Sequence, residues 1–281
     1  MLRIIPLLAC LALIFFQPAQ ANASDAATPP VHAVQATPTS CMPFIGEHLS
    51  FSIGWEFINA GSTTMDIIAI DNGWQVKTFA RTNKVLDVFK KVRDKITAEG
   101  LCINGRMQST VFDADLHERK YSAKKRTDFL WQQNQVTHTQ NQITEHFDVE
   151  AGHLSVIDAF LAVRAQTLTP GQSLTIPIFD SRKKYELVVE VLAKKETLKA
   201  PWGEKISCIL VKPKLKTAGI FTQKGEMQLW MSDDERHIPM KMMAKIKFGR
   251  VFARLTSYSK DSPQNTIPPT NTTAPQASAA P

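Results

Sequence analysis

The chain has 281 residues, of which 43% are hydrophobic and 21% charged, with 12 glycines, 16 prolines and a formal net charge of +7. This composition excludes a disordered or fibrous protein and is typical of a globular one. The positive charge favours anionic neighbours, such as lipid head groups or lipopolysaccharide phosphates, although a solvated basic surface explains the same value.

The amino terminus has the pattern of a cleaved signal peptide over residues 1–23. The apolar run Ile4–Phe16 is too short to span a bilayer, and small residues allow cleavage after Ala21 or Ala23. An uncleaved anchor and lipidation at Cys10 are the alternatives. The sequence therefore predicts export to the periplasm.

Two segments, 24–40 and 260–281, are rich in proline, threonine and alanine and show no apolar periodicity. Such segments bury too little apolar surface to offset their chain entropy, so we expect both to be disordered. A single β-rich domain is predicted between them, at 41–259.

Three cysteines remain after signal removal, and an oxidising compartment allows two of them to pair. Cys208 lies in an alternating apolar pattern, where a buried thiol is the simplest interpretation. We therefore predict a disulfide between Cys41, which precedes the first strand, and Cys102, placed in a turn at 99–105. The cysteine spacings match no zinc site, and we expect neither a metal nor a cofactor.

The first strand is predicted at 49–57, because apolar residues alternate there with mostly polar ones. A turn at 59–61, a strand at 63–70, a turn at 71–73 and a strand at 74–82 would complete a meander. The apolar positions of the first strand are Leu49, Phe51, Ile53, Trp55 and Phe57.

Two short helices interrupt the strands. Helical spacing of apolar residues predicts one at 85–92, and a second follows Ser155, a suitable N-cap, and ends before Pro170-Gly171. Together these patterns predict a mainly β protein, a strongly curved antiparallel sheet or open barrel with one or two short packed helices. Later strands are predicted at 95–98, 107–113, 126–131, 136–139, 173–179, 185–192, 206–211, 227–231, 238–248 and 250–258.

The strand at 238–248 has one apolar, methionine-rich face and one face that carries lysines. The apolar face continues beyond Gly249, where glycine suggests a bulge or tight bend. Flexible methionines suit a cavity for varied acyl chains, and an ordinary packed core is the alternative. The predicted ligand-binding residues are Phe51, Trp55, Trp230, Met240 and Met242.

Several short motifs occur in a recognisable order. They are Phe44–Phe51 followed by Trp55 and Ala60-Gly61; Ile157–Phe160; Pro170-Gly171; Ile176–Asp180 leading to Tyr185; Gly225–Pro239; and Gly249–Val251. In this order they resemble an exported bacterial family known only as domain of unknown function 3108. The resemblance implies an envelope protein with a curved antiparallel sheet and supplies no catalytic residues. Such a sheet is similar in architecture to periplasmic lipoprotein carriers, whose concave face holds acyl chains.

No motif names a reaction. The histidines lack metal-binding spacing and are expected at the surface. Asp113, Asp115 and His117 share one strand face, where a metal or a general base is conceivable, but a solvated face is the favoured interpretation. The basic triplets at 124–126 and 182–184 are expected in solvated turns, and export makes a nucleic-acid partner improbable.

The favoured function is non-enzymatic binding or carriage of an amphipathic cell-envelope molecule. A lipid or anionic envelope component is the expected partner, with peripheral membrane contact. The alternatives are an envelope glycan or peptide hydrolase, which needs paired carboxylates, and a scaffold for an envelope protein complex, which needs a large exposed apolar patch.

Overall fold

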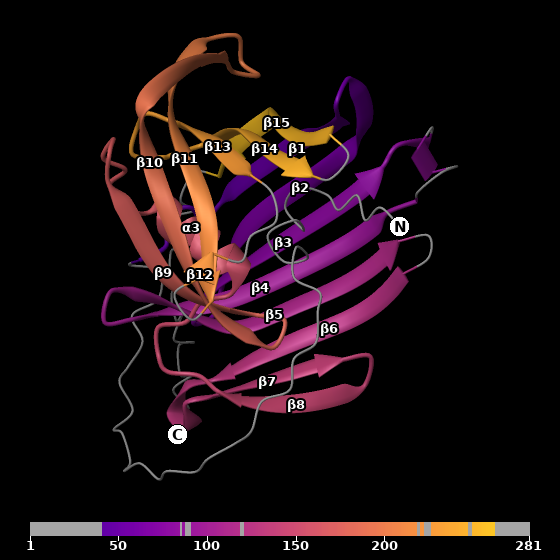
Figure 1. Cartoon of the computed structure of the whole chain (residues 1–281), viewed down its shortest axis with the longest axis vertical. Coiled ribbons are helices and arrows are strands. Elements are labelled where there is room, and N and C mark those ends of the chain that lie inside the picture. Colours follow the sequence, from indigo (N-terminus) through magenta and orange to yellow (C-terminus); the bar gives the residue numbers. More distant parts are fainter. Residues whose placement is uncertain are drawn as a thin grey trace, which may run out of the picture.

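The computed structural model describes residues 41–261 except 85, 88–90, 119–120, 218–219, 222–225 and 247–248. One antiparallel sheet curves around a short helix (Figure 1). Its strands follow the order β8-β7-β6-β5-β4-β3-β2-β1-β15-β14-β13-β11-β10-β9, with β12 paired to β11. This confirms the predicted mainly β, strongly curved antiparallel fold.

The elements have the following bounds: β1 Glu47–Trp55, β2 Ile58–Ile70, β3 Gly73–Thr82, β4 Arg93–Ile103, β5 Arg106–Glu118, β6 Tyr121–Leu130, η1 Trp131–Gln133, β7 Gln135–Gln140, β8 Ile143–Asp148, α3 Val156–Arg164, β9 Ser173–Asp180, β10 Lys183–Lys199, β11 Lys205–Thr217, β12 Ile220–Phe221, β13 Met227–Ser232, β14 Pro239–Ile246 and β15 Gly249–Lys260.

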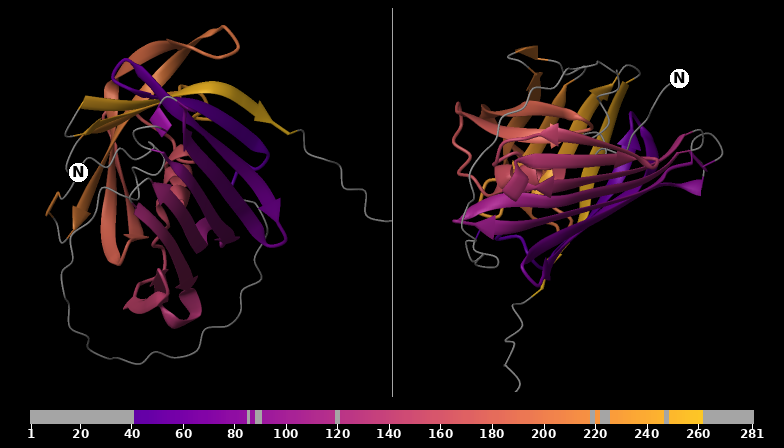
Figure 2. Two further views of the ribbon diagram at one scale, coloured as in Figure 1. Left: turned by 90° about the vertical axis from the view of Figure 1, so that its right-hand side faces the viewer. Right: turned by 90° about the horizontal axis from the view of Figure 1, so that it is seen from below.

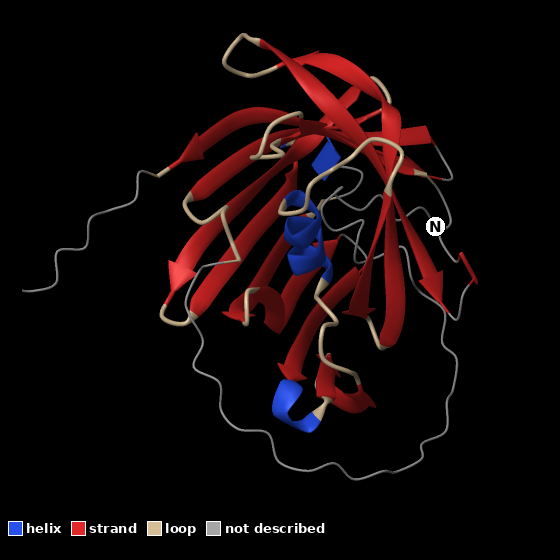
Figure 3. Ribbon diagram, turned by 90° about the vertical axis from the view of Figure 1, so that its left-hand side faces the viewer, coloured by secondary structure: helices blue, strands red, loops and turns tan. Residues whose placement is uncertain are grey.

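Helix α3 lies inside the curve of the sheet, with strands around it (Figure 3). Ser155 caps it as predicted, since its hydroxyl accepts from the Asp158 amide, and all nine helical residues are buried. The helix ends at Arg164, several residues before Pro170-Gly171, which therefore does not terminate it. Of the other predicted helix, Lys84, Leu86 and Asp87 are helical, while 85 and 88–90 lie outside the described residues.

The first strand was predicted at 49–57, but in the structure it ends two residues earlier. β1 stops at Trp55, Glu56 has a positive φ of 48°, and Phe57 is 99% exposed in the turn. The chain thus reverses before Ile58 rather than at 59–61, which lies inside β2. Alternating apolar residues continue through the turn, so periodicity alone could not reveal it.

The two edges of the sheet, β8 and β9, come together through side chains. Phe147 contacts Phe179 with ring centroids 5.4 Å apart, and Arg182 forms an ion pair with Glu145. The sheet curls accordingly in the two views of Figure 2. No backbone ladder between β8 and β9 is found in the part of the chain that the structure describes. This boundary, formed by Glu145, Phe147, Phe179 and Arg182, is called the seam below.

A disulfide joins Cys41 to Cys102 with a Cα–Cα distance of 5.9 Å. Cys102 lies within β4 and not in a turn, because that strand continues to Ile103. Cys208 is free, and burial raises the pKa of its thiol to about 11.

Within the described residues, no helix is long and apolar enough to cross a bilayer.

Candidate functional site: a recess on the inner face of the sheet

Alternation along β6 turns a lysine toward the interior. Ala123, Lys125, Thr127 and Phe129 are all buried, whereas Lys124 between them is exposed. The prediction that triplet 124–126 forms a solvated turn is therefore wrong, because the triplet lies mid-strand and side chains of a strand alternate between the two faces. Only 5% of Lys125 is exposed.

Two further buried polar side chains, Thr127 and His138, lie near Lys125 on β6 and β7. Thr127 pairs in register with His138 of β7, and the Thr127 hydroxyl lies 2.9 Å from His138 Nδ1. The Nε2 atom of His138 is buried and has no hydrogen-bond partner. His138 is thus an interior residue, as are His153 and His237, so the expectation of surface histidines is wrong for these three.

The acid of the site comes from the far edge of the sheet. Asp180 ends β9, and the turn to β10 follows at Ser181 and Arg182, both with positive φ. The Ser181 hydroxyl donates to Asp180 Oδ1 at 3.2 Å, while the buried Oδ2 has no hydrogen-bond partner.

These groups line one recess between the inner face of β4–β7 and the β9–β10 turn. Four apolar residues of β4 and β5 form the apolar part of that inner face. The enclosed part of the recess has room for about one water molecule. The lining residues are Ile96, Phe112, Ala114, Leu116, Lys125, Thr127, His138, Asp180 and Ser181.

Burial dominates the electrostatics of the recess. It raises the pKa of Asp180 to about 7, although the nearby Lys125 charge acts in the opposite direction. Burial, with the charges of Lys125 and Arg182, lowers the pKa of His138 to about 4. At neutral pH the recess therefore combines a neutral imidazole with a carboxyl group that is divided between its two protonation states.

The five predicted ligand-binding residues do not line this recess. Phe51, Met240 and Met242 are buried in the core on the inner face, and Trp55 is half-buried beside it. Trp230 pairs in register with Lys241, whose ammonium nitrogen lies 4.1 Å from the centroid of the indole ring. The preceding residue, Leu229, pairs with Met242, so Trp230 and Met242 lie on opposite faces of the sheet. One cavity cannot be lined by all five, because neighbouring strand positions point to opposite faces.

The acidic face of β5 is a set of partly exposed ion pairs. Asp115 lies 2.9 Å from His117 Nε2, and Asp113 lies 3.9 Å from Arg126, which also bonds Asp128 at 2.7 Å. Within the described ranges, no group of three His, Cys, Asp or Glu side chains is arranged to hold a metal ion.

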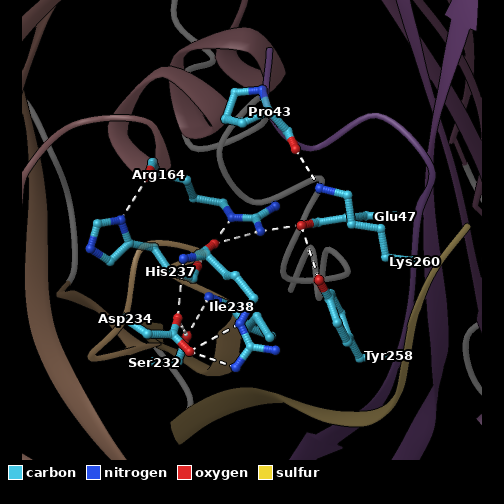
Figure 4. Close-up of polar contacts among 10 residues, drawn as sticks. Pro43, Glu47, Arg164, Ser232, Asp234, His237, Ile238, Tyr258 and Lys260 are labelled. Carbon is cyan, nitrogen blue, oxygen red and sulfur yellow. Dashed lines mark hydrogen bonds and ion pairs between the residues drawn. The ribbon is translucent and has the colours of Figure 1, made fainter. Parts of the chain in front are cut away.

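A second buried polar cluster fixes the helix in place (Figure 4). Arg164, the last residue of α3, donates to Glu47 at 2.8 Å and to the carbonyl oxygens of Arg236 and His237 at 3.0 and 3.1 Å. Tyr258 donates to the other oxygen of Glu47 at 3.2 Å. These bonds tie α3 to β1, β15 and the β13–β14 turn, so we interpret the cluster as structural.

Comparisons with known proteins bear on the fold and the family. A family model described as "Protein of unknown function (DUF3108)" matches residues 50–256. The chain belongs to the DUF3108 family. No curated protein matches it. Among solved structures, it is similar to a β-barrel-like protein of domain of unknown function DUF1849 from Brucella abortus, with a TM-score of 0.56 and 8% identity over 78% of this chain and 98% of that one.

The DUF3108 match covers every residue of the recess, but the family description assigns none of them a role. Sequence reasoning missed Lys125, His138 and Asp180. The sequence contained one signal for Lys125, because it stands at alternate positions with the apolar residues Ala123 and Phe129 and so shares their face of the strand. Nothing local indicates that Asp180 meets residues of β6 and β7.

Proposed function

We propose that this DUF3108 protein is an exported, periplasmic protein that binds or carries an amphipathic cell-envelope molecule without converting it chemically. The observation that carries the proposal is the recess, where apolar side chains of β4 and β5 lie beside three ionisable side chains. The signal-like amino terminus and the Cys41–Cys102 bond support an oxidising compartment.

The polar groups suit an anionic head group. The Lys125 ammonium supplies a positive charge, and the protonated form of Asp180 supplies a hydrogen-bond donor. Desolvation strengthens both contacts, because the charges are weakly screened by water inside the fold. Ile96, Phe112 and Leu116 offer the apolar surface that an alkyl segment requires.

The volume restricts how such a molecule binds. Since the enclosed part holds about one water molecule, a polar head and a short apolar segment fit only when the recess widens. A longer chain enters when the seam between β8 and β9 parts. Separating the seam breaks side-chain contacts, such as that of Phe147 with Phe179. Within the described residues no ladder joins β8 to β9, and the backbone bridge between Leu154 and Ile178 lies beyond the end of β8.

The two alternative functions have less support. A hydrolase of the paired-carboxylate type needs two facing acids, and the recess lining contains one, Asp180. A scaffold needs a broad exposed apolar patch, whereas the large exposed hydrophobic residues of the described chain come mainly from separate turns and strand ends, such as Phe57, Ile143 and Trp202.

Native mass spectrometry of gently purified protein, followed by thermal shift with dodecyl phosphate, tests the proposal. We expect a co-purified amphiphile and a raised melting temperature, because a ligand at about 100 times its Kd stabilises by roughly 2.7 kcal/mol. Lys125→Met should weaken binding about tenfold or more, and Lys124→Met, on the outer face of the same strand, should leave it unchanged. Equal losses in both variants, or the absence of any bound or stabilising amphiphile, would refute the proposal.

A further inference from the structure

The turn between β1 and β2 displays two apolar side chains to solvent. Phe57 is 99% exposed and Ile58 is 49% exposed. The turn is held firmly, because the Glu56 amide donates to the Arg250 carbonyl oxygen at 2.8 Å and Glu56 Oε1 accepts from the Arg250 amide at 2.5 Å. Phe57 and Ile58 are adjacent apolar side chains that the fold leaves in water, and contact with something outside the chain would bury them.

Next to this turn, the outer face of β14 and β15 carries four basic side chains, and neither strand contains an acidic residue. Lys241 pairs in register with Arg254, and Lys245 pairs with Arg250. Like charges directly opposite each other destabilise a sheet unless a counter-charge lies nearby. Glu56 supplies a counter-charge to one of these four side chains, since its carboxylate lies 3.5 Å from the Arg250 guanidinium.

An aromatic side chain lies among these cations. The charged groups of Lys241, Arg254 and Arg250 lie 5.5, 4.8 and 5.9 Å from the centroid of the Phe252 ring. Burial is the main cause that lowers the pKa of Lys241, and the Arg254 charge adds to it while the Glu196 charge opposes it. The surface thus combines concentrated positive charge with aromatic groups, as membrane-interface sites do.

We propose that this surface, formed by Phe57, Ile58, Lys241, Lys245, Arg250 and Arg254, docks the protein on an anionic phospholipid membrane. Phe57 and Ile58 enter the interface between head groups and acyl chains, while the basic row contacts lipid phosphates. Charge complementarity selects this occupant, since opposite surface potentials attract. The inference goes beyond the proposed binding function, and none of its residues lines the recess.

Vesicle flotation of the purified protein, after removal of residues 1–23, tests the docking. We expect binding to vesicles of equal parts phosphatidylglycerol and phosphatidylcholine, little binding to pure phosphatidylcholine, and weaker binding at high salt. Phe57→Ala should weaken binding about tenfold. Replacing Lys245 and Arg254 together with glutamine should weaken it about 25-fold, at about fivefold for each charge.

Two matched controls make the result specific. Ile143→Ala removes another exposed apolar side chain, 63% exposed at the β7–β8 turn, and Lys77→Gln removes an exposed lysine of β3. Both should bind like the unchanged protein. A further variant, Phe57→Trp, should gain emission that brominated phosphatidylglycerol quenches.

The proposal is overturned if the protein ignores phosphatidylglycerol vesicles, if it binds pure phosphatidylcholine equally well, or if Ile143→Ala weakens binding as much as Phe57→Ala. Binding to lipopolysaccharide or to a protein without binding to these vesicles also overturns it. Since Phe57 lies outside the recess, loss of docking in Phe57→Ala with unchanged dodecyl phosphate binding separates this inference from the proposed function.

Discussion

Replacing Arg164 by methionine tests whether the buried ion pair holds α3 inside the sheet. The side chains of Arg164 and Glu47 are 0% and 1% exposed, and their closest atoms are 2.8 Å apart. The variant keeps much of the side-chain volume, which also packs on the Phe44 ring, but it leaves the Glu47 carboxylate buried without its cation.

The expected cost follows from that isolated charge. Removing one partner of a buried pair destabilises a protein by about 3–5 kcal/mol. For a domain of this size, 1 kcal/mol corresponds to about 2–4 °C, so the melting temperature should fall by roughly 6–20 °C. Glu47→Leu combined with Arg164→Met removes both charges and should cost clearly less than the two single changes added together.

Urea denaturation followed by circular dichroism measures these free energies of unfolding. Arg126→Met provides the control, since Arg126 forms an equally short pair with Asp128 at 2.7 Å but with half-exposed side chains. The free energy of unfolding of this control variant should fall by about 1 kcal/mol or less. If Arg164→Met costs no more than Arg126→Met, or if the double variant costs the full sum of its singles, the assigned role of the buried pair is incorrect.

Three further predictions follow from other contacts. Reducing the Cys41–Cys102 bond, which closes a separation of 61 residues, should lower the free energy of unfolding by about 4 kcal/mol, measured by urea denaturation with and without reductant; no change on reduction would contradict this. Because the pKa of Asp180 is raised to about 7, the native protein binds a proton that the unfolded chain releases near pH 4, so the contribution of Asp180 to stability should fall as pH rises from about 4 to 7, against the opposite contribution of His138. Asp180→Asn should remove this loss of stability, which is at most about 4 kcal/mol. If the variant had the same pH profile of stability as the unchanged protein, Asp180 would not be the group responsible. Ser155→Ala should cost about 1–3 kcal/mol, because the hydroxyl caps α3 and also donates to the Asp158 carboxylate at 2.8 Å; a denaturation midpoint equal to that of the unchanged protein would show that the cap is dispensable.

Local patterns predicted the elements well where burial on one face was regular. The alternation of Leu49, Phe51 and Ile53 predicted β1, and Ser155 predicted the start of α3. β8 was missed because all six of its residues are exposed or half-buried, which leaves no apolar alternation to detect. A strand stabilised mainly by backbone bonds to its neighbour has little sequence signature.

The candidate site was harder to predict for a different reason. The five apolar residues expected to line a cavity were chosen by residue type, and Trp230 belongs to the opposite face from Met242 because β13 turns alternate side chains outward. Lys125 and His138 were expected at the surface, since lysine and histidine are usually exposed, and no role was predicted for Asp180. Only the curvature of the sheet brings the β9–β10 turn over β6 and β7.

By itself, the sequence determined a two-faced, mainly β chain with an N-capped helix, because strand alternation and helix capping depend on neighbouring residues. The tertiary structure alone decided that Glu47 meets Arg164, 117 residues away, and that Asp180 meets Lys125 and His138. Those contacts depend on strand order, register and the curling of β8 toward β9. Such properties arise from packing the whole sheet around α3, and no local pattern encodes them.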